Sequence, residues 1–149
     1  MKDINRFLEA QETTYQQALQ EVKSGRKTSH WIWYIFPQIE GLGQSYASHY
    51  YGIEDIEEAK AYLQQPLLKQ RLLEISNALL EVEGKTSFEI FGTLDAIKVQ
   101  SSMTLFHITN PEEEVFKQVL DKYYDGTLDE NTIEKLNTKS YQKEKGRGI

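Results

Sequence analysis

Apolar residues recur at steps of three and four along most of the chain, which is the spacing of one buried helix face. The first such stretch runs from Ile4 to about Ser24, and Gly25 can end it in the left-handed conformation. Similar stretches cover residues 45–51, 54–64, 66–84, 95–108, 110–124 and 129–136. Short connections between helices place neighbours antiparallel around one core. The pattern therefore predicts an all-α, compact single domain, a bundle of about seven helices.

Two segments carry the residues of a helix start. Thr86 and Glu89 have the spacing of a capping box, in which each side chain satisfies a free backbone amide of the other. Asn110 followed by Pro111 and three acidic residues predicts a second helix start, with Asn110 as the cap.

One segment departs from helical spacing. The run from His30 to Phe36 consists almost entirely of large aromatic and aliphatic side chains, which fits either a buried strand or a short buried helix. Its aromatic and β-branched residues favour an extended chain, in which Trp31 and Trp33 would share one face. Two interpretations stay open: a plug of the core, or a plug that also forms a pocket wall on which a planar ring stacks. In the second, His30 is a hydrogen-bonding or acid–base group.

A second polar segment begins at Asp95. On a helix, Asp95, Lys98 and Ser102 form one polar stripe, and Ser101 lies on a more buried one. Lys98 could lower the pKa of Ser102 or hold an anionic ligand. The alternative is an ordinary surface pair of Asp95 with Lys98.

We expect a functional pocket built from residues 30–38 and 98–106. Its candidate catalytic residues are His30, Asp95, Lys98 and Ser102. Its candidate ligand-binding residues are Gln11, Trp31, Trp33, Pro37, Gln38 and Ser101. Gln38 could instead satisfy a neighbouring loop, and Gln11 is included because it lies near the apolar stripe of the first helix.

Composition removes several classes of site. The chain has no cysteine, which excludes disulfides, a cysteine nucleophile and thiolate metal sites. It has no phosphate loop, dinucleotide fingerprint, paired-histidine zinc motif or calcium loop, so we predict neither a metal nor a cofactor. No secretory signal follows Met1, and no apolar run approaches a membrane span, so a cytoplasmic protein without membrane contact is expected.

Charge divides the chain in two. The net charge is −6, yet residues 137–149 hold four basic residues and one acidic residue. We therefore expect a single domain over residues 1–136 and a flexible, basic tail over 137–149. An acidic domain repels nucleic-acid phosphates, so no nucleic-acid partner is expected. The sequence indicates no oligomeric state.

The chain resembles the DUF1810 family over nearly its whole length. Two long motifs carry the resemblance: Gly25-x-Lys27-x-Ser29-His30-Trp31-x-Trp33-x-x-Phe36-Pro37-Gln38 and Phe91-Gly92-x-x-Asp95-x-x-Lys98-x-x-Ser101-Ser102-Met103-Thr104-Leu105-Phe106. The resemblance implies a compact helical domain without an established activity. Members are sometimes labelled calpastatin, which implies a protease inhibitor, but these residues contain no extended inhibitory segment.

The chain is more distantly similar to the NADAR superfamily, through a Phe-x-x-Ala-Gln helix, aromatic plugs and a late polar helix. That similarity implies ADP-ribose or NAD chemistry, including cleavage of N-glycosidic bonds. Gln11 stands where such enzymes place a glutamate, so no catalytic residue is carried over. We therefore expect a protein that binds, or an enzyme that acts on, a nucleotide-like small molecule, in which Asp95 or His30 would stabilise charge or activate water. The alternative is a non-catalytic module that binds proteins through exposed aromatics of residues 30–38.

Overall fold

The computed structural model describes residues 2–147, with side chains through residue 143. Over this part, the chain forms nine α-helices, and its one β-type contact is an isolated bridge between Ile39 and Ile53. The helices are α1 (Asn5–Glu12), α2 (Tyr15–Lys23), α3 (Ile32–Ile35), α4 (Tyr46–Tyr50), α5 (Ile56–Gln64), α6 (Pro66–Glu81), α7 (Ser87–Thr109), α8 (Glu114–Tyr124) and α9 (Glu130–Arg147). The all-α prediction is confirmed, and the expected number of about seven helices is too low.

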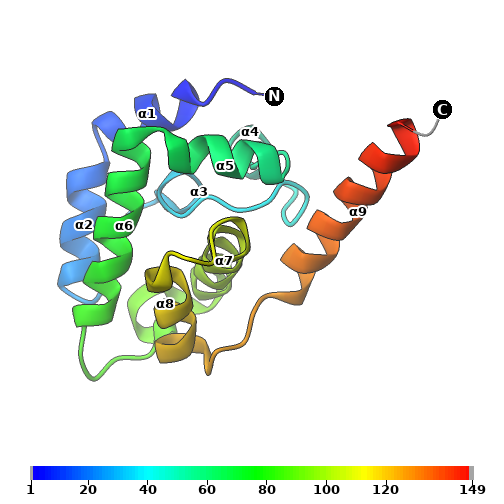
Figure 1. Cartoon of the computed structure of the whole chain (residues 1–149). Coiled ribbons are helices and arrows are strands. Elements are labelled where there is room, and N and C mark those ends of the chain that lie inside the picture. Colours follow the sequence, from blue (N-terminus) through cyan, green and yellow to red (C-terminus); the bar gives the residue numbers. More distant parts are fainter. Residues whose placement is uncertain (1, 148–149) are drawn as a thin grey trace.

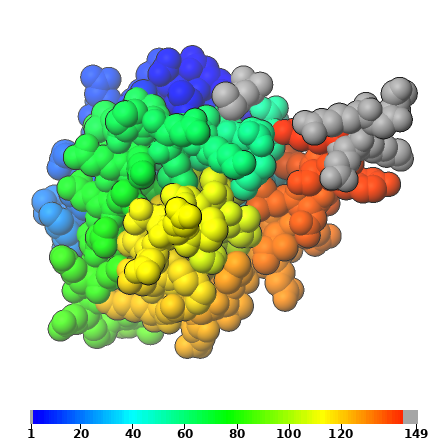
Figure 2. Space-filling model, in the orientation of Figure 1, coloured from blue at the N-terminus to red at the C-terminus, as the bar shows by residue number. Residues whose placement is uncertain are grey.

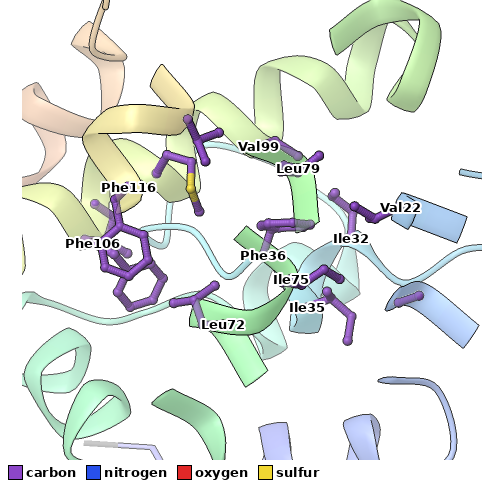
Figure 3. Packing of buried hydrophobic residues seen from close by; sticks show 14 of the residues in the cluster. Val22, Ile32, Ile35, Phe36, Leu72, Ile75, Leu79, Val99, Phe106 and Phe116 are labelled. Carbon is purple, nitrogen blue, oxygen red and sulfur yellow. The ribbon is translucent and has the colours of Figure 1, made fainter. Parts of the chain in front are cut away.

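The helices surround one apolar core. In Figure 1, α2 and α6 run side by side at one edge of the molecule, α7 passes through the centre next to α8, and α9 lies at the opposite edge. Figure 3 shows the interior, where Phe36 from the segment after α3 lies near Ile75 of α6 and Val99 of α7. Farther along this core, Phe106 of α7 meets Phe116 of α8 with ring centroids 5.9 Å apart.

The predicted first helix is broken into α1 and α2 at Thr13 and Thr14. Between Leu8 and Tyr15 the sequence has no large apolar side chain that could continue one buried face. A straight helix would therefore gain nothing by packing through this stretch, whereas two helices pack separately on α6. Gly25, with φ of +77°, ends this region in the left-handed conformation as predicted.

The segment around the tryptophans contains one helical turn, α3, so of the two open alternatives the short buried helix is correct and the favoured extended chain is wrong. The amides of Ile35 and Phe36 donate to the carbonyls of Trp31 and Ile32, at 3.2 and 3.0 Å. A helical turn directs successive side chains around the axis, whereas a strand would send half of this bulk to the opposite face. As a result, Trp31 is 1% exposed and Trp33 is half-buried, and the two rings do not share a face.

Helix α7 carries the later motif, and it is bent. Thr86 and Glu89 form the predicted capping box, with hydrogen bonds of 3.1 and 2.9 Å. Gly92 then adopts φ 81° and ψ 169°, which bends the helix one turn before Asp95. At the far end the predicted helix start is wrong by several residues, because Asn110 is the C-cap of α7 and α8 begins at Glu114.

Helix α9 begins on a polar network. Oδ2 of Asp129 accepts hydrogen bonds from the hydroxyl groups of Ser101 and Thr132, at 2.9 and 2.6 Å. The helix continues to Arg147 through residues expected to form a tail, and Lys143 pairs with Asp55 at 2.9 Å. Residues 148 and 149 of that segment lie outside the described residues. Figure 2 shows the orange first half of α9 against the body.

A buried ion pair fixes the N-terminal region. Arg6 of α1 donates to both carboxylate oxygens of Glu58 in α5, at 2.8 and 3.1 Å, and both side chains are almost fully buried. Arg6 also donates to the carbonyls of Tyr50 and Gly52, so one guanidinium holds the end of α4 and the segment after it.

In the described range, 2–147, none of the helices is long and apolar enough to cross a membrane.

Candidate functional site

A pocket of about 350 Å³ lies where the aromatic segment faces the beginning of the straight part of α7. It is lined by Lys27, His30, Trp31, Ile32, Trp33, Tyr34, Ala47, Asp95 and Lys98. The structure therefore brings His30 and Trp33 of the first motif together with Asp95 and Lys98 of the second. This is the convergence on which the sequence-based pocket depended.

The loop that leads into α3 is built around the carboxylate of Glu21 in α2. This buried group accepts hydrogen bonds from the amides of Thr28 and Ser29, at 2.7 and 3.0 Å, and from the Ser29 hydroxyl, at 2.5 Å. Nε1 of Trp31 donates a fourth bond of 3.0 Å. Burial opposes ionisation, but the bonds from Ser29, Thr28 and Trp31 outweigh it and lower the pKa of Glu21 to about 2. Glu21 therefore fixes the loop from which Lys27 and His30 reach the pocket.

Three charged side chains form one end of the pocket. Nζ of Lys27 lies 2.8 Å from Oδ2 of Asp95, and Nζ of Lys98 lies 3.2 Å from the other oxygen, Oδ1. Burial disfavours the charged form of Asp95, but the hydrogen bonds and charges of Lys27 and Lys98 outweigh it, so the pKa of Asp95 is lowered. The cluster is thus an ionised carboxylate between two ammonium groups, with one positive charge in excess.

The two lysines differ in their freedom. The side chain of Lys27 is 7% exposed, and its Nζ also donates to the Ser29 carbonyl at 2.5 Å. The side chain of Lys98 is 27% exposed, and its one described hydrogen bond is to Asp95. Lys27 is therefore a fixed part of the wall, whereas Lys98 is more exposed and is held by fewer hydrogen bonds.

Aromatic rings form the adjoining wall of the pocket. Nζ of Lys98 lies 4.5 Å from the centroid of the Trp33 ring, within the range of a cation–π contact. Trp31 packs edge-on against Phe91 and beside Phe36, with centroids 6.5 and 6.2 Å apart, and so belongs to the core. Trp33 is therefore the more accessible of the two tryptophans, and His30 is exposed at the pocket.

The serines predicted beside Lys98 lie outside the pocket lining. Ser102 is fully buried in α7, and its hydroxyl has no hydrogen-bond partner within the described part of the chain. Ser101 is buried too and donates to Asp129 at the start of α9. The nitrogen of Lys98 pairs with Asp95, so no contact supports activation of Ser102 by Lys98.

The two candidate amides also lie away from the pocket lining. Gln11 is 1% exposed, and its Nε2 donates to the carbonyl of Tyr34 at 2.8 Å and to Oη of Tyr62 at 3.1 Å. Gln38 follows the buried Pro37, and its main-chain carbonyl accepts a hydrogen bond from the amide of Ile53 at 2.8 Å. The side chain of Gln11 thus holds the backbone of α3 from inside the fold, whereas the side-chain nitrogen of Gln38 is buried with no hydrogen-bond partner within the described part of the chain.

Sequence reasoning did not single out four residues of the pocket lining: Lys27, Ile32, Tyr34 and Ala47. Lys27 belongs to the first motif, two residues before Ser29, so the motif could have indicated it as a pocket residue. Nothing in the local sequence indicates Ala47, because the contact depends on how α4 folds back over α3.

Several other hollows lie elsewhere on the described surface. One of about 480 Å³ separates α1 from α6 at Leu8 and Arg71, and one of about 190 Å³ lies between α9 and α5 at Ile56 and Lys143. The described residues that line them include no aromatic side chain. The pocket beside Trp33 is therefore the better candidate for binding a ring.

Comparison with known proteins places the whole domain in one group. The model of the family described as "Protein of unknown function (DUF1810)" matches residues 1–136. The crystal structure of the conserved hypothetical protein Rv1873 from Mycobacterium tuberculosis is 43% identical, with a TM-score of 0.89 over 91% of this chain and 96% of that one. No curated protein matches the chain significantly.

Proposed function

The chain belongs to the DUF1810 family, and we propose that it binds a small nucleotide-like molecule in the pocket between Trp33 and Asp95. The observation that carries the proposal is the meeting of a half-buried indole with a cationic cluster in one pocket. Ligand pockets of this kind combine an apolar or aromatic wall with a few polar groups that fix orientation. A planar ring would stack on Trp33, and an anionic group would meet Lys98.

The charge and volume of the pocket narrow the ligand. Lys27 neutralises Asp95, so Lys98 supplies the one positive charge in excess. A volume of about 350 Å³ lies at the lower end of small-molecule sites. Both properties favour a ring that carries one phosphate or carboxylate, and a longer molecule such as ADP-ribose would extend beyond the pocket.

If the protein is an enzyme that cleaves an N-glycosidic bond, Asp95 and His30 would have different roles. Both oxygens of Asp95 face ammonium groups, and its lowered pKa makes it a poor proton acceptor. Asp95 would then position Lys98, whose ammonium would bind the anionic group of the substrate. His30 is exposed and is the group able to activate water.

Calorimetry and NMR test the proposal together. Titration of the protein with AMP, ADP-ribose, NAD and ribose 5-phosphate should give the tightest binding for a ligand with both a ring and a phosphate. The indole N–H signals should respond at Trp33. Trp33→Leu should weaken AMP binding about tenfold or more, since stacking on an aromatic is worth about 1–3 kcal/mol per base.

Tyr46→Leu is a matched control, because Tyr46 is 79% exposed and does not line the pocket. It should leave AMP binding unchanged. The proposal is wrong if none of these ligands binds, or if Trp33→Leu binds AMP as well as the unmodified protein does.

The alternative of a protein-binding aromatic surface has weaker support. Trp31, Ile35 and Phe36 are all buried, so most of the aromatic segment is unavailable to a partner. What the segment offers at the surface is His30 and part of Trp33 and Tyr34.

A further inference from the structure

The position of Lys98 conflicts with the simplest form of stacking on Trp33. Its ammonium lies over the indole, 4.5 Å from the ring centroid, while the same nitrogen is paired with Asp95 at 3.2 Å. A ring that stacks on this face must take the place of the ammonium. The face is therefore covered in the unliganded protein.

The contacts of Asp95 hold Lys98 in this place. The second oxygen of Asp95 is held by Lys27, whose side chain is 7% exposed and fixed by the Ser29 carbonyl. Asp95 therefore cannot follow Lys98 outward without breaking its pair with Lys27. Lys98 itself is tied by one hydrogen bond and one cation–π contact, both of which it loses when it swings away.

The cost of displacing Lys98 depends on the charge of the ligand. A neutral ring displaces the ammonium and offers it no new partner. A ring that carries a phosphate or carboxylate offers Lys98 an anion, and a charge-assisted hydrogen bond replaces the pair with Asp95. The same side chain thus opposes one class of ligand and favours the other.

We infer that Lys98 is a specificity gate, which keeps neutral rings off Trp33 and admits planar ligands that carry an anionic group. The inference rests on the proposed function of the pocket and assigns the discrimination to one residue. It differs from a simple phosphate contact, because a simple contact would strengthen anionic ligands without excluding neutral ones.

A first experiment needs no ligand. Trp31 is 1% exposed, so acrylamide quenching of tryptophan fluorescence reports mainly on Trp33. Lys98→Ala should increase the quenching constant, because the ring loses its cover. Lys98→Met should increase it less, since the methionine side chain still reaches over the ring. Equal quenching in the unmodified protein and Lys98→Ala overturns the inference, whatever the pocket binds.

The second experiment compares AMP with adenosine, which share the ring and differ in the phosphate. Lys98→Ala should bind adenosine about two- to fivefold more tightly than the unmodified protein, which corresponds to removal of a cation–π contact. The preference for AMP over adenosine should fall about tenfold. Lys60→Ala is the control, because Lys60 is exposed on α5 and lies outside the pocket lining.

The outcomes separate the two proposals. If Lys98→Ala weakens AMP and leaves adenosine unchanged or weaker, Lys98 is an anion contact and the gate is wrong, while the proposed function stands. If neither protein binds AMP or adenosine, the proposed function fails, and the quenching result alone decides whether Lys98 covers Trp33. Tighter adenosine binding by Lys98→Ala supports both.

Discussion

Nε1 of Trp31 donates a 3.0 Å hydrogen bond to a carboxylate oxygen of Glu21, and both side chains are buried. The bond connects α2 to the beginning of the pocket wall. The other donors to Glu21 are Thr28 and Ser29, which lie between Lys27 and His30 in the chain. The shape of the pocket therefore depends on one ionised group beneath it.

Glu21→Gln should lower the free energy of unfolding, by an amount that depends on pH. The pKa of Glu21 is lowered from 4.5 to about 2 in the folded state, so its contribution to stability is complete above about pH 4.5. That contribution is lost as pH falls from 4.5 towards 2. Urea unfolding at pH 7 and pH 3 should show a larger cost of Glu21→Gln at pH 7. Glu83→Gln, at an exposed position, should show little cost at either pH.

Removal of one partner from the Arg6–Glu58 pair should be strongly destabilising. Arg6→Met leaves a fully buried carboxylate without its cation, which costs about 3–5 kcal/mol. The double variant Arg6→Met/Glu58→Met should lose clearly less than the sum of the single variants. Lys60→Met, which breaks an exposed pair with Glu57, should cost less than about 1 kcal/mol. Additive losses in urea titrations would contradict this account of the pair.

Gly92→Ala should destabilise the fold without any steric clash. No atom lies within 4 Å of an added Cβ, but φ of 81° with ψ of 169° belongs to a region that is essentially restricted to glycine. The expected loss is about 1–3 kcal/mol in the free energy of unfolding. Thr93→Ala, at the next and exposed position, should change it by less than about 0.5 kcal/mol. A neutral Gly92→Ala variant would show that the bend is not required.

Asp95→Asn should strengthen the binding of an anionic ligand. It removes the negative charge between Lys27 and Lys98, so AMP should bind about threefold more tightly at low salt. The gain should shrink as salt rises, because part of it is screened. Calorimetry with Asp121→Asn, which breaks the exposed Lys117 pair on α8, should show no gain. Weaker AMP binding by Asp95→Asn would mean that Asp95 itself contacts the ligand.

Deletion of residues 137–149 should leave a folded domain. The start of α9 is held by Asp129 and by Leu136, which is 9% exposed, and both remain. The known loss is the Lys143–Asp55 pair, which is partly exposed and worth less than about 1 kcal/mol. Circular dichroism and urea unfolding would measure the cost. A loss of several kcal/mol would move the domain boundary beyond residue 136.

Features fixed by neighbouring residues were predictable. The capping box of Thr86 with Glu89 and the left-handed turn at Gly25 each depend on a few residues in sequence. The break between α1 and α2 could also have been predicted, because the sequence between Leu8 and Tyr15 has no large apolar side chain. Asn110 with Pro111 misled because the same residues serve equally well to end one helix and turn towards the next.

Features fixed by distant partners were not predictable in detail. Composition singled out the aromatic segment, but whether Trp31 or Trp33 would be free depended on Phe91 and on Glu21, which take Trp31 into the core. Ser102 looked equivalent to Lys98 on the helix stripe. The two positions lie about 40° apart around the helix axis, and the packing of α7 in the centre of the bundle buries Ser102 and leaves Lys98 accessible.

The pocket is lined by a loop and helix near the N-terminus and by a helix in the second half of the chain. The complete lining therefore forms only when these two parts of the chain pack together in the folded protein. Any molecule that recognises this wall must therefore bind the native state and ignore the unfolded one. By thermodynamic linkage, such a molecule at a hundred times its dissociation constant adds about 2.7 kcal/mol to stability. The melting temperature of the whole domain thus becomes a reporter of occupancy, so a ligand can be sought among metabolites without knowing the reaction.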